Sequence, residues 1–239
     1  MSNIQSSFLS YTVDNETFEG YLVYQADNNP AQPGIVIAPN WMGATTDAAE
    51  QAKAIAAHGY VVLVADLYGQ GQRPTNGEEA GAMMMAVKDT PAEVARMQAA
   101  LSALRTQTTA PVNADKVAAI GFCFGGHCVL ELARSGADIK AAASFHGTLD
   151  TQGAYDSHTI QASLLVLDGA ADPLVPREQL AAFANEMNSK GVDWQLVSFA
   201  GAVHSFTDPK ADNAGVSQYH PEVTQRAFKR LYQLLDEVF

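Results

Sequence analysis

The sequence is poor in cysteine, with only Cys123 and Cys128 among its 239 residues. The two lie five positions apart, and the turn that we expect between them makes a disulfide bridge geometrically poor. Two thiols without a Cys-x-x-Cys pair also argue against a zinc site and against a thioredoxin-like redox pair. So few cysteines are consistent with a protein of a reduced compartment.

Basic residues are scarce as well: 14 lysines and arginines stand against 26 acids, which gives a formal net charge of −12. An acidic surface repels phosphate backbones and anionic lipid, so we expect no nucleic acid and no membrane as partners. No apolar run approaches the ~20 residues of a spanning helix. The N-terminus lacks the basic and apolar regions of a signal peptide, and we therefore expect a soluble, cytoplasmic protein.

What the chain does have is the length and apolar content for a large core, since 47% of its residues are hydrophobic. No linker, internal repeat or low-complexity segment interrupts it, so we expect residues 1–239 to form one domain.

Short apolar strands alternate with helical segments from residue 35 onward. This order predicts an α/β fold with a mainly parallel central sheet and helices on both faces. An antiparallel hairpin is expected before it at 7–24, followed by a surface connection at 28–34. The expected strands are 34–39, 60–66, 116–120, 141–145, 163–167 and 194–199, and the expected helices are 46–58, 91–106, 128–134, 177–190 and 219–239.

The most informative stretch runs from Ala119 to Cys128. Here an apolar strand meets glycines that flank a cysteine, in the order Gly121-Phe122-Cys123-Phe124-Gly125-Gly126. This is the pattern of a nucleophile elbow, a sharp strand-to-helix turn that exposes one reactive side chain. Glycine two residues on either side avoids collisions in so tight a turn. The helix N-terminus would stabilise a thiolate, so we interpret Cys123 as a nucleophile.

An acid and a histidine follow later strands. Asp172 lies in the loop after the expected strand at 163–167, and His204 lies in the loop after the last strand. A parallel sheet brings these loops to one edge, and nucleophile, acid, histidine is the chain order of the α/β-hydrolases. His204 would activate the thiol and protonate the leaving alkoxide, while Asp172 would orient the imidazole. Asp168 is the alternative acid, although its position directly after the strand favours a turn.

The oxyanion of such a reaction needs main-chain donors. The N–H of Phe124 is the first, and the loop after the first parallel strand should supply the second, for which we choose Trp41 and then Met42. His146 follows a strand at the same edge of the sheet and is expected in the substrate pocket. The full set that we assign to this pocket is Asn40, Met42, Arg73, His146 and Phe206.

These motifs resemble the dienelactone hydrolase family. The matching segments are Gly121 to Gly126, Asp172-Pro173 with Val175-Pro176, His204-Ser205-Phe206, and Asp66-Leu67-Tyr68-Gly69. The resemblance extends from residue 20 onward and implies a monomeric α/β-hydrolase domain without metal or cofactor, although a weak homo-oligomer also fits our reading. It implies a catalytic triad of Cys123, His204 and Asp172. It also implies hydrolysis of a small ester or lactone, in the best-known members an unsaturated lactone that carries a carboxylate.

Two positions depart from the pattern of that family. Members that open dienelactone have a glutamate at the position of Asn40 and an arginine just after the catalytic histidine, where this chain has Asp208. Without the glutamate, the formation of the Cys123 thiolate must depend on His204 and on the helix N-terminus. Arg73 is the candidate replacement for the arginine. An acid in place of a cation favours a neutral ester or lactone as substrate, and the alternative is a non-catalytic ligand-binding protein that keeps the fold.

Overall fold

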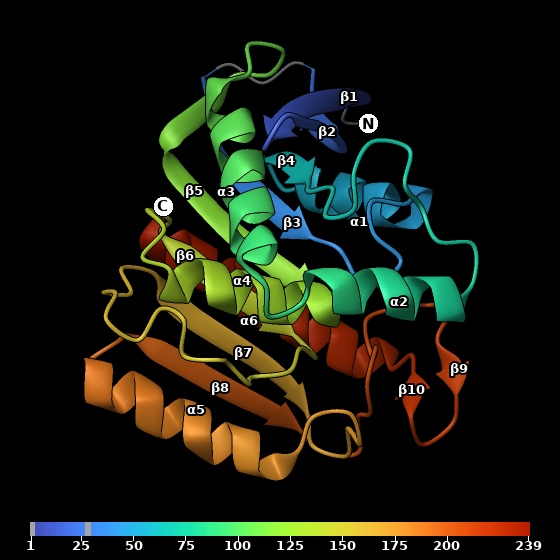
Figure 1. Ribbon diagram of the computed structural model, residues 1–239, viewed down its shortest axis with the longest axis vertical. Coiled ribbons are helices and arrows are strands. Elements are labelled where there is room, and N and C mark those ends of the chain that lie inside the picture. The colour runs from blue at the N-terminus through green and yellow to red at the C-terminus, as the bar shows by residue number, and fades with distance from the viewer. Residues whose placement is uncertain (1–2, 27–29) are drawn as a thin grey trace. The chain divides into compact units, whose positions relative to one another are not determined.

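Two units make up the chain, Met1–Ala119 and Ile120–Phe239. The computed structural model describes residues 3–26 and 30–239. The first two residues of the predicted connection at 28–34 and the first two residues of the chain lie outside that part. Figure 1 shows strands with helices packed on them in each unit. The expectation of a single domain over residues 1–239 stays a prediction.

The first unit opens with the predicted antiparallel hairpin. Strands β1 (Ile4–Val13) and β2 (Glu16–Gln25) pair along their whole length. Asp14 and Asn15, which join them, have φ angles of +48° and +67°. Two consecutive left-handed residues are what a type I′ turn requires, and Asp and Asn tolerate this conformation better than other side chains do. Local turn chemistry thus sets the register of the hairpin.

The remaining strands of the first unit follow the order β1-β2-β4-β3-β5. β4 (Val61–Val64) is antiparallel to β2 and parallel to β3 (Gln32–Ala38). β5 (Val112–Phe122) begins in this unit and ends in the second. The helices of the first unit are α1 (Thr46–Ala56), α2 (Gly77–Val87) and α3 (Pro91–Thr106).

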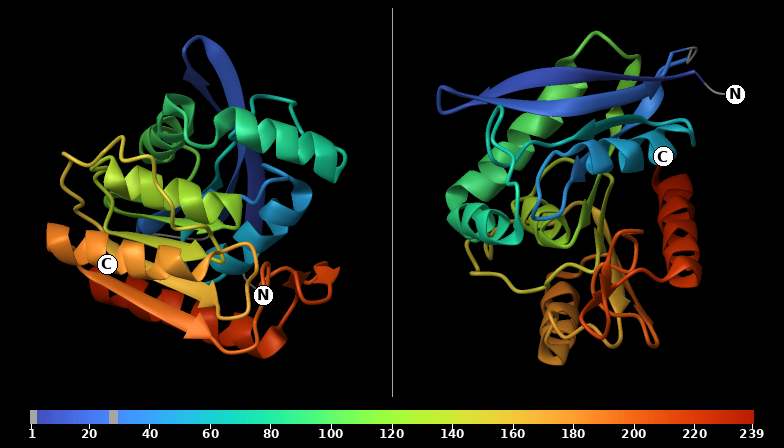
Figure 2. Two further views of the ribbon diagram at one scale, coloured as in Figure 1. Left: turned by 60° about the horizontal axis from the view of Figure 1, so that its bottom comes forward. Right: turned by 90° about the vertical axis from the view of Figure 1, so that its right-hand side faces the viewer.

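In the second unit the strands follow the order β5-β6-β7-β8. β6 (Ala141–Phe145), β7 (Ser163–Gly169) and β8 (Trp194–Phe199) are parallel to one another. Figures 1 and 2 show helices α4 and α5 on one face of these strands and α6 on the other. The bounds of these helices are Phe124–Arg134, Arg177–Lys190 and Pro221–Val238. A short hairpin of β9 (Asp212–Asn213) and β10 (Ser217–Gln218) was not expected from the sequence.

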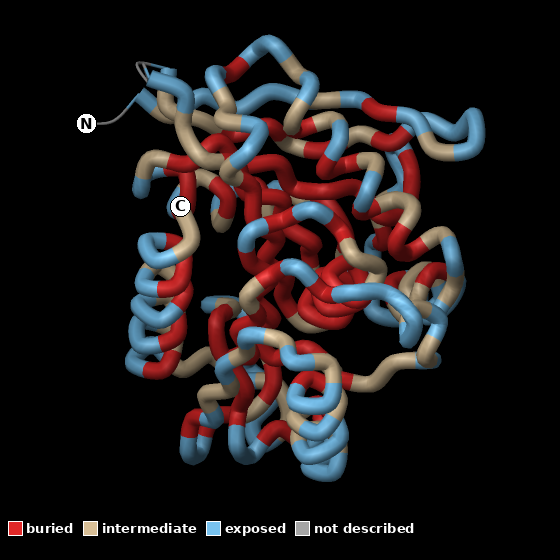
Figure 3. Tube along the Cα trace, turned by 90° about the vertical axis from the view of Figure 1, so that its left-hand side faces the viewer, coloured by how far each residue is buried: buried red, intermediate tan, exposed pale blue. Residues whose placement is uncertain are grey.

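Helix α6 shows how the sequence pattern produces the packing of the second unit. Its buried residues recur at intervals of three and four, as a single apolar stripe requires. Figure 3 shows that stripe turned inward and the rest of the helix exposed or partly exposed. The stripe consists of Val223, Ala227, Leu231, Leu234 and Leu235. No helix in the described part of the chain has both the length and the apolar content to cross a membrane.

The predicted fold class is confirmed, with an antiparallel hairpin followed by mainly parallel strands that alternate with helices. The expected start of α4 is wrong by four residues, since the helix begins at Phe124 rather than at Cys128. Gly125 and Gly126 disfavour a helix by intrinsic propensity. Gly126 is needed there because the first turn of α4 packs against neighbouring backbone, where a Cβ at this position would meet the Cα atom of Gly147 at 2.9 Å. Tertiary packing therefore overrides propensity at this turn.

Candidate active site

Cys123 occupies a strained turn between β5 and α4. Its φ and ψ angles are +55° and −118°, outside the regions that a cysteine normally adopts. Such a conformation costs on the order of 1–3 kcal/mol and persists only where the surroundings enforce it. A Cβ atom at Gly121 would collide with the carbonyl group of Gly125, so only glycine fits there. The turn has the geometry of the elbow that the sequence predicts.

The surroundings of the Cys123 thiol suit a nucleophile. Cys123 is half-buried, whereas Cys128, on α4, is completely buried. The first turn of α4 contains no acidic residue, so the positive end of its dipole is not neutralised locally. Phe124 is the first residue of the helix, and its N–H is among those that a helix leaves unpaired. A thiolate and a neighbouring oxyanion would both be stabilised at this helix end.

Asp172 and His204 form the second part of the site. The Oδ2 atom of Asp172 lies 2.8 Å from the Nδ1 atom of His204, and its Oδ1 atom accepts the N–H of Leu174 at 2.8 Å. The main chain of His204 is held on the β9–β10 hairpin, because its N–H donates to Val216 and its carbonyl accepts the N–H of Gln218. Asp172 thereby fixes the orientation of the imidazole through Nδ1 and leaves Nε2 available for proton transfer.

Three effects determine the pKa of His204. Burial lowers it, but the hydrogen bond to Asp172 and the interactions with Cys123 outweigh burial and raise the pKa to about 10. The Nε2 atom is buried and has no partner in strict hydrogen-bonding geometry among the described residues. The thiol thus acts on the imidazole at close range without an aligned hydrogen bond, as is common in unliganded enzymes. At neutral pH His204 can therefore carry the proton of the pair.

The alternative acid, Asp168, serves a different partner. Its carboxylate receives two hydrogen bonds from Arg177, at 2.7 and 3.0 Å, and one from the hydroxyl of Ser198 at 2.6 Å. Asp168 thus braces the end of β7 against β8 and the start of α5. Of the two acids considered from the sequence, Asp172 is the one that contacts His204.

Asn40, Trp41 and Met42 belong to the first unit, in the loop after β3. The side-chain oxygen of Asn40 accepts the N–H of Met42 at 2.9 Å, and the carbonyl of Trp41 accepts the hydroxyl of Tyr68 at 2.7 Å. Since the N–H of Met42 is already engaged, Trp41 remains the better choice for the second oxyanion donor. That role, and the pocket roles of Asn40 and Met42, stay predictions.

Two predicted pocket residues have structural contacts. All three guanidinium nitrogens of Arg73 donate inside the first unit, to Asp66 and to the carbonyls of Ala44 and Glu19 among others. These bonds hold the long loop after β4. The side chain of Phe206 is completely buried, which anchors the loop that carries His204 in the core. The pocket roles of Arg73 and Phe206 stay predictions.

His146, which follows β6, is also buried, and its expected role in the pocket stays a prediction. Its Nδ1 atom accepts the main-chain N–H of Cys123 at 3.1 Å, and its Nε2 atom lies 2.8 Å from the hydroxyl of Thr207. Thr207 was missed from the sequence. A threonine three residues after a histidine carries no pattern of its own, and only the fold brings it to His146.

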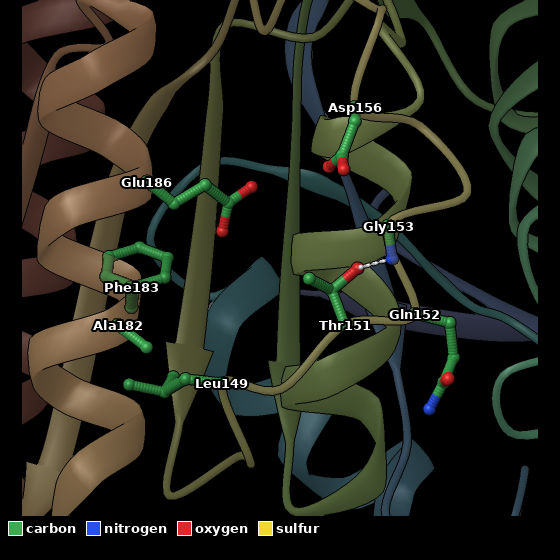
Figure 4. A pocket seen from close by; sticks show the side chains of 8 residues that line it. All are labelled: Leu149, Thr151, Gln152, Gly153, Asp156, Ala182, Phe183 and Glu186. Carbon is green, nitrogen blue, oxygen red and sulfur yellow. Dashed lines mark hydrogen bonds between the residues drawn. The ribbon is translucent and has the colours of Figure 1, made fainter.

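A separate cavity of about 440 Å³ lies in the second unit, between α5 and the loop after β6 (Figure 4). Asp156 and Glu186 contribute carboxylates to its wall. Glu186 binds Arg134 at 2.8 Å, and Lys190 lies within 4 Å of both acids. These charges compensate one another, and the cavity is lined by residues other than the triad.

A cysteine on a strained strand-to-helix turn, with a histidine and its aspartate on loops after later strands, defines a hydrolase of the α/β-hydrolase class. The comparison with known families agrees. The sequence model of the dienelactone hydrolase family matches residues 18–239, and the chain belongs to that family. It is therefore an enzyme, a hydrolase of the ester and lactone type.

Relatives with similar sequences and structures are known. The solved structure named m3DLH is 37% identical, with a TM-score of 0.92, and the match covers 99% of both chains. A dienelactone hydrolase-like promiscuous phosphotriesterase from metagenomic libraries is 35% identical, with a TM-score of 0.90 and the same coverage. A Bradyrhizobium protein named probable 2-oxo-3-(5-oxofuran-2-ylidene)propanoate lactonase is 27% identical over 82% of this chain and 80% of its own.

Proposed function

We propose that the enzyme hydrolyses a neutral carboxylic ester or lactone through a covalent thioester at Cys123. The observation that carries this proposal is the His204 imidazole, which is bound to Asp172 on one side and coupled to the Cys123 thiol on the other. This is the arrangement of nucleophile, base and orienting acid that acyl transfer requires.

The first half-reaction forms the thioester. The Cys123 thiolate attacks the carbonyl carbon, and the negative charge that develops on the carbonyl oxygen is stabilised by the N–H of Phe124 and by a second donor, predicted to be Trp41. The bond between the carbonyl carbon and the ester oxygen then breaks. The leaving alkoxide takes the proton that His204 carries, so that an alcohol departs and the imidazole becomes neutral.

The second half-reaction releases the acid. Neutral His204 takes a proton from water as the oxygen of that water attacks the thioester carbon. The carbon–sulfur bond breaks, and the carboxylic acid leaves while Cys123 returns to the thiolate and His204 to the imidazolium. Asp172 stabilises the imidazolium in both halves of the cycle without itself taking the proton.

The preference for a neutral substrate follows from the charged groups of the chain. The guanidinium of Arg73 is engaged within the first unit, and Asp208 stands where the best-known relatives have an arginine. A formal charge of −12 adds a field that repels anions. Neutral phosphotriesters are a second candidate, favoured by the 35% identity to the promiscuous phosphotriesterase.

Alkylation with iodoacetamide tests the proposed function. We expect one carbamidomethyl group on Cys123, complete loss of p-nitrophenyl acetate hydrolysis in proportion to labelling, and protection by a slowly hydrolysed ester. Cys128 should remain unlabelled because it is completely buried. A panel with p-nitrophenyl acetate, a neutral lactone, dienelactone and a neutral phosphotriester then compares substrate classes, and the two neutral carboxylic substrates should exceed dienelactone in kcat/KM.

Full hydrolysis after stoichiometric labelling of Cys123 would contradict the proposal. Labelling without turnover of any panel member would favour the alternative, a ligand-binding protein with a hydrolase fold. Higher kcat/KM for the phosphotriester than for every carboxylic substrate would favour the second candidate.

The raised pKa of His204 predicts a dependence on pH and on the leaving group. The protonated imidazole persists up to about pH 10, so kcat/KM for an alkyl ester should stay high at moderately alkaline pH and fall as pH rises through that value. The leaving group of a p-nitrophenyl ester needs no proton, so kcat/KM for this ester should fall less over the same pH range. Initial rates, corrected for spontaneous hydrolysis, measure both profiles, and a fall for the alkyl ester near pH 6.5 would contradict the assignment.

A further inference from the structure

The main-chain N–H of Cys123 has two acceptors. It donates to the carbonyl of Phe145 at 3.0 Å and to the Nδ1 atom of His146 at 3.1 Å. A further main-chain contact of the turn comes from the N–H of Gly126, which donates to the carbonyl of Cys123 at 2.9 Å. Since φ and ψ at Cys123 are strained, these bonds hold the thiol in its exposed position.

His146 is itself firmly placed. Its φ angle is +42°, and its main-chain N–H donates to the carbonyl of Leu167 on β7 at 2.8 Å. The ring lies edge-on to Phe206, with centroids 5.0 Å apart, and to His204, with centroids 5.2 Å apart. The imidazole is therefore enclosed by the loop that carries the catalytic histidine.

The two ring nitrogens must have opposite roles. Because Nδ1 accepts the N–H of Cys123, it carries no hydrogen, and the hydrogen of a neutral imidazole must then sit on Nε2. Nε2 donates to the hydroxyl of Thr207 at 2.8 Å. Burial, followed by the charge at His204, lowers the pKa of His146 well below 6.5. A neutral ring is thus maintained beside an imidazole that cycles between charged and neutral forms.

We infer that His146 is a positioning residue of the hydrolase, which in its Nε2–H tautomer links the main chain of Cys123 to Thr207 on the His204 loop. The link couples the two sides of the reaction, because a shift of either loop moves the thiol relative to the imidazole. The expected effect of His146 on catalysis rests on the proposed function. The tautomer of His146 and its hydrogen bonds can be measured whether or not the protein hydrolyses esters.

The direct measurement is made on the unliganded wild-type protein. Long-range ¹⁵N–¹H correlation spectra of the histidine rings should show His146 with an unprotonated Nδ1 and a protonated Nε2 at neutral pH. Alkylation of Cys123 by iodoacetamide should be slower in His146→Leu than in wild type. A protonated Nδ1 on His146 would overturn the inference, and neither readout depends on ester hydrolysis.

Paired variants separate positioning from simple packing. His146→Leu removes both polar atoms and should lower kcat by about 100-fold, the effect of roughly 1 Å of misplacement, with KM within about threefold of wild type. His146→Asn keeps an acceptor near the Nδ1 position and should recover at least about tenfold of that loss. Thr207→Val should lower kcat by about tenfold, and Thr207→Ser, which keeps the hydroxyl, should stay close to wild type.

A matched control is His158→Asn, since His158 is an exposed histidine of the same unit; it should leave kcat unchanged. Thermal unfolding of every variant shows whether the fold is intact. Equal kcat for His146→Leu and wild type, or equal losses in His146→Leu and His146→Asn at equal stability, would overturn the inference. If wild type hydrolyses no ester, the proposed function fails, and the spectra and alkylation rates still decide the role of His146.

Discussion

Replacing Cys123 with alanine is expected to lower kcat/KM for p-nitrophenyl acetate by at least about 10⁴-fold, the scale seen when a covalent nucleophile is removed. The physical reason is that alanine offers no atom that can form the acyl intermediate. The oxyanion donors and His204 would remain, and they can promote only a direct attack by water. Steady-state rates of wild type and variant, each corrected for spontaneous hydrolysis, measure the effect.

The second cysteine provides the matched control. Cys128 is completely buried in helix α4, five residues after Cys123. Cys128→Ala should keep kcat/KM within about threefold of wild type, and its cost should appear in the free energy of unfolding, on the order of 1 kcal/mol for a small lost group. Equal rates for Cys123→Ala and wild type would remove Cys123 from the mechanism.

Asp172→Asn is the second change with a large expected effect, a fall in kcat of up to about 10⁴-fold. An asparagine of the same size can donate to Nδ1 of His204, which selects the wrong tautomer. It also removes the carboxylate whose hydrogen bond and charge help to raise the pKa of His204. The fall of kcat/KM for an alkyl ester at alkaline pH should therefore begin at a lower pH in this variant.

Asp168→Asn is the matched control for Asp172→Asn, since both are buried acids, one at the end of β7 and the other in the loop that follows it. Asp168 binds Arg177 and Ser198, so its loss should reduce the free energy of unfolding by about 1–3 kcal/mol and leave the tautomer of His204 unchanged. Similar losses of kcat in the two variants, at similar stability, would contradict the assignment of Asp172 as the acid of the triad.

The elbow and the pairing of His204 with Asp172 could be predicted because their residues carry local signals. Gly121 marks a turn too tight for a side chain, and the order Cys123, Asp172, His204 places each residue after a strand. The parallel arrangement then brings these strand ends together without further information. Even the choice between Asp172 and Asp168 followed from distance to the strand end, and the contact with His204 supports it.

The contacts that could not be predicted concern side chains whose partners come from distant parts of the chain. Arg73 looked available for a substrate because its carbonyl acceptors lie as far away as Glu19, 54 residues earlier. Phe206 looked like a pocket residue because it neighbours His204, yet the turn at Ser205, with a φ of +53°, directs it into the core. Sequence adjacency to a catalytic residue does not determine which way a side chain points.

The link between His146 and Thr207 was hidden for the same reason. Its two residues are 61 positions apart, and each is an ordinary residue in its own segment. The bond to the N–H of Cys123 also depends on the strained angles of the turn, which no sequence pattern reports. The candidate nucleophile could be proposed from the sequence, whereas the contacts that hold it required the fold.

The most direct test of the central claim, that Cys123 is the acylated nucleophile, is the mass of the intact protein during turnover. The enzyme is mixed with excess p-nitrophenyl acetate, quenched in acid at short times, and weighed and mapped by mass spectrometry. We expect one acetyl group per chain, on Cys123, formed with a burst of p-nitrophenolate and absent from Cys123→Ala. Turnover without any acyl adduct on Cys123, or with the same adduct on another residue, would contradict the account.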